Sequence, residues 1–183
     1  MKELSLNILD VAQNSVTAGA DKIEITVDEQ PQLNSLTIKI RDNGCGMEKE
    51  LLEKVTDPFT TTRTTRNVGL GLPFFKMAAV MTGGSFDIES YPGVGTTVTA
   101  VFVYDNIDRM PLGDVGATFA MLLGSKPGIN WIFTLRFVRD EFMFDSDKII
   151  EQTGELDFGD PEIQLWLTDY FHEQQQLLYG GTV

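Results

Sequence analysis

The feature that most restricts how this chain can fold is a line of polar side chains in an apolar segment near the N-terminus. Residues 6–20, LNILDVAQNSVTAGA, have the apolar spacing of a helix that is buried on most of its surface. Asn7, Asp10 and Asn14 follow one another on that helix at i, i+3 and i+7. Burying polar side chains costs free energy unless they find partners, so the line faces either solvent or a site that uses polar groups. Asp10 and Asn14 are one turn apart and are expected to face the same space.

The segments after this helix predict an α/β fold. Two alternating segments separated by a polar turn predict an antiparallel hairpin. Helices and a threonine-rich loop follow, and then two more strands. The expected elements are strands at 22–27, 36–41, 85–89 and 96–104, helices at 48–55 and 68–81, and a loop at 56–67. This order predicts helices laid on one face of a mixed sheet.

The composition changes near Asp105, where we place a domain boundary between residues 1–104 and residues 105–183. The second part is expected to be a small acidic α+β extension of unknown role. Its predicted elements are a helix at 114–123, a hairpin formed by 131–138 and 141–144, and an amphipathic helix at 161–178.

Charge and composition exclude several classes of protein. The formal net charge of -13 opposes extended contact with nucleic-acid phosphates or anionic lipid. No apolar run approaches the roughly 18 residues that span a bilayer, and the N-terminus does not resemble a signal peptide. The single cysteine, Cys45, excludes an internal disulfide framework and fits a reducing compartment. We therefore expect a cytoplasmic protein that contacts neither nucleic acid nor membrane.

Several common active-site motifs are absent from the sequence. No G-x-x-x-x-G-K-[ST] motif occurs, and the two G-x-G segments lack the third glycine of a dinucleotide fingerprint. One histidine, His172, and one cysteine are too few for a zinc site or for a Cys/His nucleophile pair.

Three further segments carry residues suited to nucleotide binding. In DNGCGM, Asp42 is an acceptor at a strand end that could receive the exocyclic amine of adenine, and the glycines let the backbone approach a flat ligand. VGLGL follows two arginines, and glycines at a helix start expose N–H groups to phosphate. In GVGTTV, a strand start could bring the hydroxyl of Thr96 beside Asp42. We interpret the space in front of Asp10 and Asn14 as a nucleotide site.

In this order and spacing the four segments resemble the GHKL superfamily of ATP-binding domains, which includes histidine kinases, gyrase B-type topoisomerases, heat-shock chaperones and mismatch-repair ATPases. QNSVTAGADKIEI and RDNGCGM resemble the mismatch-repair members, and GLGLPFFKMAAVMTGGSFDIESYPGVGTTV resembles the histidine kinases. The resemblance implies a two-layer α/β sandwich (Bergerat fold), a mixed sheet with helices on one face, and bound ATP with Mg²⁺.

The resemblance also implies a role for each matching residue. Asn14 would ligate Mg²⁺, and Asp42 would receive the adenine amine with help from Thr96. The remaining implied contacts are Gly44, Gly46 and Met47 around the base, Phe59, Arg63 and Arg66 in a lid, and Gly69, Leu70, Gly71 and Leu72 at the phosphates.

Asp10 departs from the family pattern, because members that hydrolyse ATP usually have glutamate there to activate water. Aspartate is one methylene shorter, and a displacement of about 1 Å can cost roughly a hundredfold in rate. The sequence therefore predicts ATP binding with slow hydrolysis, with Asp10 as the catalytic residue.

Two functions fit these features, and a homodimer is left open for either. The first is an ATP-operated switch that regulates a partner protein; the alternative is a protein kinase acting in trans. Only residues 1–5 precede the polar helix, and His172 in FHEQQQ follows the ATP segments, so we do not expect a self-contained histidine kinase and interpret His172 as a surface residue. A DNA-repair role is set aside because of the acidic charge and the absence of a large second domain after the ATP segments.

Overall fold

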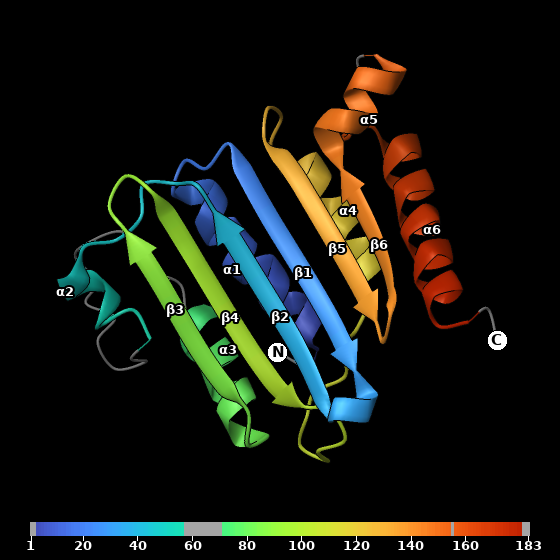
Figure 1. The fold of residues 1–183 in the computed structure, drawn as a ribbon. Coiled ribbons are helices and arrows are strands. Elements are labelled where there is room, and N and C mark those ends of the chain that lie inside the picture. Colours follow the sequence, from blue (N-terminus) through green and yellow to red (C-terminus); the bar gives the residue numbers. More distant parts are fainter. Residues whose placement is uncertain (1–2, 57–70, 155, 181–183) are drawn as a thin grey trace.

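A computed structural model describes residues 3–56, 71–154 and 156–180, and shows one six-stranded mixed sheet (Figure 1). The strand order is β3-β4-β2-β1-β5-β6. In the view of Figure 1, α1, α3 and α4 lie behind the sheet and α6 lies beside β6. The strands are β1 (Lys22–Gln30), β2 (Ser35–Asp42), β3 (Ser85–Tyr91), β4 (Gly95–Val103), β5 (Asn130–Phe137) and β6 (Asp140–Asp145). The helices are α1 (Leu4–Thr17), α2 (Lys49–Leu52), α3 (Gly71–Met81), α4 (Val115–Ser125), α5 (Ser146–Thr153) and α6 (Pro161–Leu178), with a 3-10 turn at Pro31–Leu33.

The alternation of β1 places its apolar residues against the helices. Ile23, Ile25 and Val27 are buried on the helix-covered face, while the residues between them are less buried on the opposite face. β1 and β2 pair antiparallel, with Ile25 opposite Ile40, as the sequence predicted. The predicted α/β sandwich with a mixed sheet is therefore confirmed.

Several elements begin or end at other residues than predicted. α1 spans Leu4–Thr17, earlier than the predicted 6–20, and Gly19 follows it with φ +75°. α2 has four residues where eight were predicted. β1 continues to Gln30 although its apolar alternation ends at Val27, because its backbone pairs with β2 and β5 over its whole length. In the predicted helix 68–81, the first three residues lie outside the described ranges.

The predicted C-terminal hairpin is present, and it extends the same sheet. β5 runs parallel to β1, with Phe133 opposite Ile25, and β6 pairs antiparallel with β5. Phe119 of α4 stacks on Phe133 with ring centroids 4.2 Å apart. Phe171 of α6 lies edge-on to both rings. The domain boundary near Asp105 stays a prediction, while the sheet and its apolar core are continuous across it.

Candidate functional site

A cavity of about 520 Å³ opens between α1, the ends of β2 and β4, and the α2 segment. It brings together predicted site residues from distant parts of the sequence, and each segment supplies part of its wall. The lining residues are Val11, Asn14, Ser15, Thr17, Ala18, Gly19, Asp42, Cys45, Gly46, Met47, Leu51, Val55, Leu72, Thr96 and Val98. The volume lies within the range of roughly 300–1,000 Å³ typical of small-molecule sites.

Asp42, at the end of β2, is held by donors from three places in the chain. Its Oδ2 accepts a hydrogen bond from Ser15 Oγ of α1 at 2.6 Å. Its Oδ1 accepts from the backbone N–H groups of Gly44, at 2.9 Å, and Thr96, at 3.2 Å. The residue is 9% exposed, so these donors fix a nearly buried carboxylate at the cavity wall.

Thr96 approaches Asp42 through its backbone, since the two residues are direct partners in the β2–β4 ladder. The sequence suggested that this strand start could bring the Thr96 hydroxyl beside Asp42. This hydroxyl is hydrogen-bonded to Ser90 Oγ, at 2.9 Å. Ser90 Oγ in turn donates to Gly95 O at 3.2 Å. Thr96 therefore both lines the cavity and ties β3 to β4 behind it.

Two glycines of the site are required by close backbone contacts. Gly46 has φ +65°, and a Cβ there would lie 2.0 Å from Tyr91 O. Gly95 has φ +127°, and a Cβ there would lie 2.0 Å from Asp42 O. Gly46, one of the two glycines predicted to admit a flat ligand, thus lets the DNGCGM turn pack against the end of β3, and Gly95 lets β4 begin directly against Asp42.

Ser15 was missed by sequence reasoning, although it donates directly to Asp42. The available signal was a hydroxyl in the apolar row that contains Ile8 and Ala12, a position where an unpartnered polar group is costly. Ser15 is 3% exposed and sits beside Asn14, so α1 contributes both an amide and a hydroxyl to this end of the cavity.

The polar line of α1 divides into three environments. Asn14 is half-buried on the cavity wall, whereas Asp10 is exposed and is not among the lining residues. A Cβ on Gly71 would lie 3.0 Å from the Cβ of Asp10, so α3 begins directly against Asp10. Asn7 is fully buried, and neither of its amide atoms has a hydrogen-bond partner within the described part of the chain.

The other predicted phosphate-site residues are covered only in part. Gly71 and Leu72 begin α3, and Leu72 lines the cavity. The remaining predicted residues, which lie outside the described ranges, are Phe59, Arg63, Arg66, Gly69 and Leu70.

The oxygen-bearing side chains of the described site fit a nucleotide bound with Mg²⁺. Asp42 of β2 is a fixed acceptor at one wall of the cavity, and Asn14 of α1 offers an amide oxygen to the same cavity. Within the described residues there is no group of three or more His, Cys, Asp or Glu side chains that could bind a metal without other ligands. Mg²⁺ commonly takes one or two protein oxygens and completes its shell with phosphates and water, so a single amide ligand is compatible with it.

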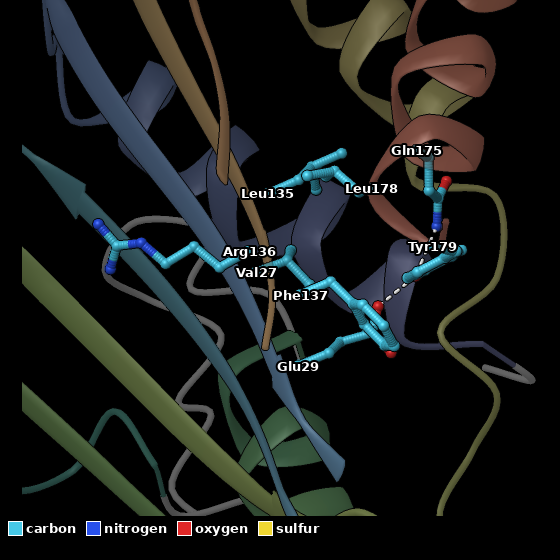
Figure 2. A pocket seen from close by; sticks show the side chains of 8 residues that line it. All are labelled: Val27, Glu29, Leu135, Arg136, Phe137, Gln175, Leu178 and Tyr179. Carbon is cyan, nitrogen blue, oxygen red and sulfur yellow. Dashed lines mark hydrogen bonds between the residues drawn. The ribbon is translucent and has the colours of Figure 1, made fainter. Parts of the chain in front are cut away.

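A second, much smaller cavity of about 10 Å³ lies at the far end of β1 (Figure 2). There the hydroxyl of Tyr179 donates to the buried carboxylate of Glu29, and Gln175 Nε2 donates to the same hydroxyl at 3.0 Å. Burial, followed by the hydrogen bond to Glu29, raises the pKa of Tyr179 well above its ordinary value of 10.0. Since the volume is about that of one water probe, we interpret this cluster as a structural contact between α6 and the sheet.

Residues 1–106 match the family model described as histidine kinase-, DNA gyrase B-, and HSP90-like ATPase, and the chain belongs to this family. The signal transduction histidine-protein kinase AtoS of Escherichia coli (strain K12) is 35% identical over 101 residues, which cover 55% of this chain and 16% of that protein. The sensor protein SrrB of Staphylococcus aureus (strain NCTC 8325 / PS 47) is 38% identical over 102 residues, 53% of this chain and 17% of that protein. The match thus spans about one sixth of these relatives.

A solved structure, the N-terminal domain of a DNA repair protein, has the same fold with a TM-score of 0.52. It is 16% identical and the match covers 78% of this chain and 52% of that chain, so the likeness concerns the fold alone. Within the described residues, none of the helices combines the length and the apolarity that crossing a bilayer requires.

Proposed function

We propose that this protein binds ATP with Mg²⁺ in the 520 Å³ cavity and acts as an ATP-dependent switch that regulates a partner protein. The observation that carries this proposal is the fixed carboxylate of Asp42 at the wall of a cavity that Asn14 also lines. A carboxylate that three donors hold in place binds an amine more tightly than a mobile carboxylate does, because its side chain loses little conformational entropy on binding.

In this proposal Asp42 accepts the exocyclic amine of adenine, and Gly46 and Met47 lie next to the base. Asn14 supplies an oxygen to Mg²⁺, which neutralises phosphate charge when it is bound. The N-terminal end of α3 at Gly71 and Leu72 presents backbone N–H groups to phosphate oxygens. Asp10, next to Gly71, orients the attacking water, and its short side chain makes hydrolysis slow.

A protein kinase that acts on a separate partner is the second candidate. It is favoured by the 35–38% identity to AtoS and SrrB, of which the first is named as a histidine-protein kinase. Incubation with γ-labelled ATP and candidate partners separates the two functions. Label on a partner would support the kinase, whereas nucleotide-dependent partner binding without label would support the switch.

Calorimetric titration with Mg·ATP tests the shared claim of nucleotide binding. We expect Asp42→Asn and Asn14→Ala each to weaken binding by about ten- to a hundredfold, because the first loses a charge-assisted hydrogen bond to the adenine amine and the second loses an oxygen ligand of Mg²⁺. Asp87→Asn is the matched control, because Asp87 is exposed on β3, away from the lining residues. If all three variants bound nucleotide like the wild type, the proposed site would be excluded.

Phosphate release at saturating Mg·ATP tests the role of Asp10. We expect Asp10→Asn to reduce the hydrolysis rate by at least about a hundredfold while it leaves the affinity for ATP nearly unchanged, because the lost group acts on water. An unchanged rate would remove Asp10 from this role, and the binding proposal would stand independently.

A further inference from the structure

One side of α6 carries acidic and apolar side chains in a single stripe. Glu162, Trp166, Tyr170, Glu173 and Leu177 recur at i, i+4, i+8, i+11 and i+15, a spacing that keeps them on one side of a helix. The side chains of Trp166 and Leu177 are 53% and 62% exposed. We call this set of five residues the α6 stripe.

The middle of the α6 stripe packs against the hydrophobic core through aromatic rings. Trp166 stacks on Tyr170, with ring centroids 5.3 Å apart, and Tyr170 lies edge-on to Phe142 of β6 at 5.8 Å. Phe142 in turn packs edge-on against Phe171, which is fully buried. The exposed indole of Trp166 is therefore supported by a chain of rings that leads into the protein.

Other sides of α6 bind it to the rest of the molecule at three points. Gln164 Nε2 donates to Ala120 O at 2.6 Å, and His172 Nε2 lies 2.7 Å from Asp114 Oδ1. Near the C-terminal end of the helix, Tyr179 donates to Glu29 (Figure 2). Because these contacts do not use the α6 stripe, the stripe is held in a fixed orientation and stays available to a partner.

The charge of the chain is concentrated around this helix. Residues 140–183 contain eleven Asp or Glu and one Lys, whereas residues 1–139 contain sixteen Asp or Glu and thirteen Lys or Arg. Two copies of the α6 stripe would therefore repel each other, and an acidic partner would be repelled as well.

We propose that the α6 stripe is a docking surface for a Lys- or Arg-rich segment of the partner protein. Glu162, at the first position of the stripe, and Glu173, between Tyr170 and Leu177, would pair with its cations. The ring of Trp166 would pack against an arginine guanidinium by a cation–π contact, and Leu177 would cover apolar side chains. This inference rests on the proposed function, because it locates the binding site of the regulated partner.

A fluorescence titration with a synthetic amphipathic peptide of arginine and leucine tests the proposal. An acidic peptide of equal length serves as the control. The chain has two tryptophans, and Trp131 is 1% exposed, so Trp166 reports on the α6 stripe. We expect a saturable change in emission with the basic peptide and none with the acidic one. Glu162→Gln/Glu173→Gln should weaken binding at least about tenfold.

The matched control is Asp147→Asn/Glu151→Gln, which makes the same change in net charge on exposed residues of α5. We expect it to change the dissociation constant less than about twofold, because exposed charges are screened beyond roughly 8 Å at physiological salt. Equal weakening by both double variants would mean attraction by net charge alone and would overturn the proposal.

A second pair of variants tests the apolar part by calorimetry. Trp166→Ala should weaken peptide binding by about tenfold, and Leu165→Ala, also exposed on α6 but outside the stripe, should not. If the wild type self-associated and Trp166→Ala abolished this self-association, the partner at the stripe would be a second copy of the chain, and the proposal would be overturned. Mg·ATP titrations of the wild type keep the two claims apart: a wild type that binds Mg·ATP but not the basic peptide refutes the docking surface alone, and one that binds the peptide but not Mg·ATP refutes the nucleotide site alone.

Discussion

The Asp42 carboxylate depends on hydrogen bonds from residues that are far apart in the sequence. Ser15 comes from α1, Gly44 from the turn after β2, and Thr96 from β4. A carboxylate that is almost buried needs these donors, because an unpaired oxygen would carry its full desolvation cost. The adenine acceptor proposed here is therefore also a structural link between three elements.

Ser15→Ala is expected to lower the free energy of unfolding by about 1–3 kcal/mol, because it leaves Asp42 Oδ2 without its 2.6 Å donor. Urea denaturation followed by circular dichroism measures this loss. Thr17→Ala serves as the control, since the Thr17 hydroxyl is exposed and bonds within the helix to Gln13 O. That variant should stay within about 0.5 kcal/mol of wild type. Equal stability of Ser15→Ala and wild type would contradict the structural role of this hydrogen bond.

Gly46→Ala and Gly93→Ala separate backbone strain from steric contact. Both glycines have positive φ, +65° and +73°, so an alanine is strained at either position. At Gly46 the new Cβ would also lie 2.0 Å from Tyr91 O, whereas at Gly93 no described atom lies within 4 Å. We expect Gly46→Ala to be less stable than Gly93→Ala by about 1–3 kcal/mol in thermal unfolding. Similar midpoints for both variants would show that the turn moves to accept the methyl group.

At the scale of elements, the contact between α4 and α6 includes a hydrogen-bonded Asp–His pair at a helix start. Asp114 caps α4 by accepting from Ala117 N at 2.8 Å, and its Oδ1 also lies 2.7 Å from His172 Nε2. Although burial raises the pKa of Asp114, the hydrogen bonds from Ala117 and His172 outweigh it and hold this pKa below its ordinary value of 3.8. The ionised form is thus the one that the folded protein favours.

A carboxyl whose pKa falls on folding stabilises the protein above its unfolded pKa, and this stabilisation is lost as the pH falls through the folded value. We therefore expect wild type to be more stable than Asp114→Asn at pH 7, by less than about 1 kcal/mol because the pair is half exposed. The difference should shrink toward zero as the pH falls below 3.8 and through the folded pKa of Asp114. Thermal melts of both proteins from pH 7 to pH 2 measure it. A difference that did not shrink at low pH would contradict this role of the Asp114 carboxylate.

At the scale of the whole molecule, residues 105–183 share a sheet and a core with the family domain. β5 pairs with β1 over eight residues, and the Phe119, Phe133 and Phe171 rings join α4, β5 and α6. Removing this region would expose one side of β1 and its apolar residues to water. We therefore expect the chain to unfold as one cooperative unit, despite the change in composition near Asp105.

Trp166→Phe leaves Trp131 of β5 as the sole tryptophan, which makes this expectation testable. In this variant, the emission of Trp131 and the far-ultraviolet circular dichroism should give the same melting midpoint. Mg·ATP should raise that midpoint although Trp131 is not among the residues that line the cavity, because ligand binding stabilises the whole cooperative unit. Two separate midpoints, with the Trp131 midpoint insensitive to nucleotide, would support two domains.

The fold and much of the candidate site follow from local patterns in the sequence. The alternation in β1 and β2 predicted the hairpin, and residues of the DNGCGM and GVGTTV segments line one cavity together with Asn14. Contacts through the backbone or between distant elements could not be predicted in this way. Asp42 accepts a hydrogen bond from the Thr96 backbone N–H because the β2–β4 register aligns the two backbones, and no side-chain pattern reports that contact.

The sequence by itself determined the class of fold and the family, because periodicity and turn chemistry are local properties of the chain. Only the tertiary structure decided that β5 joins β1, that Ser15 holds Asp42, and that α6 presents its acidic stripe outward. The physical reason is that these features depend on which buried surfaces and backbone edges pair across long sequence distances. That pairing is settled by the packing of the whole core.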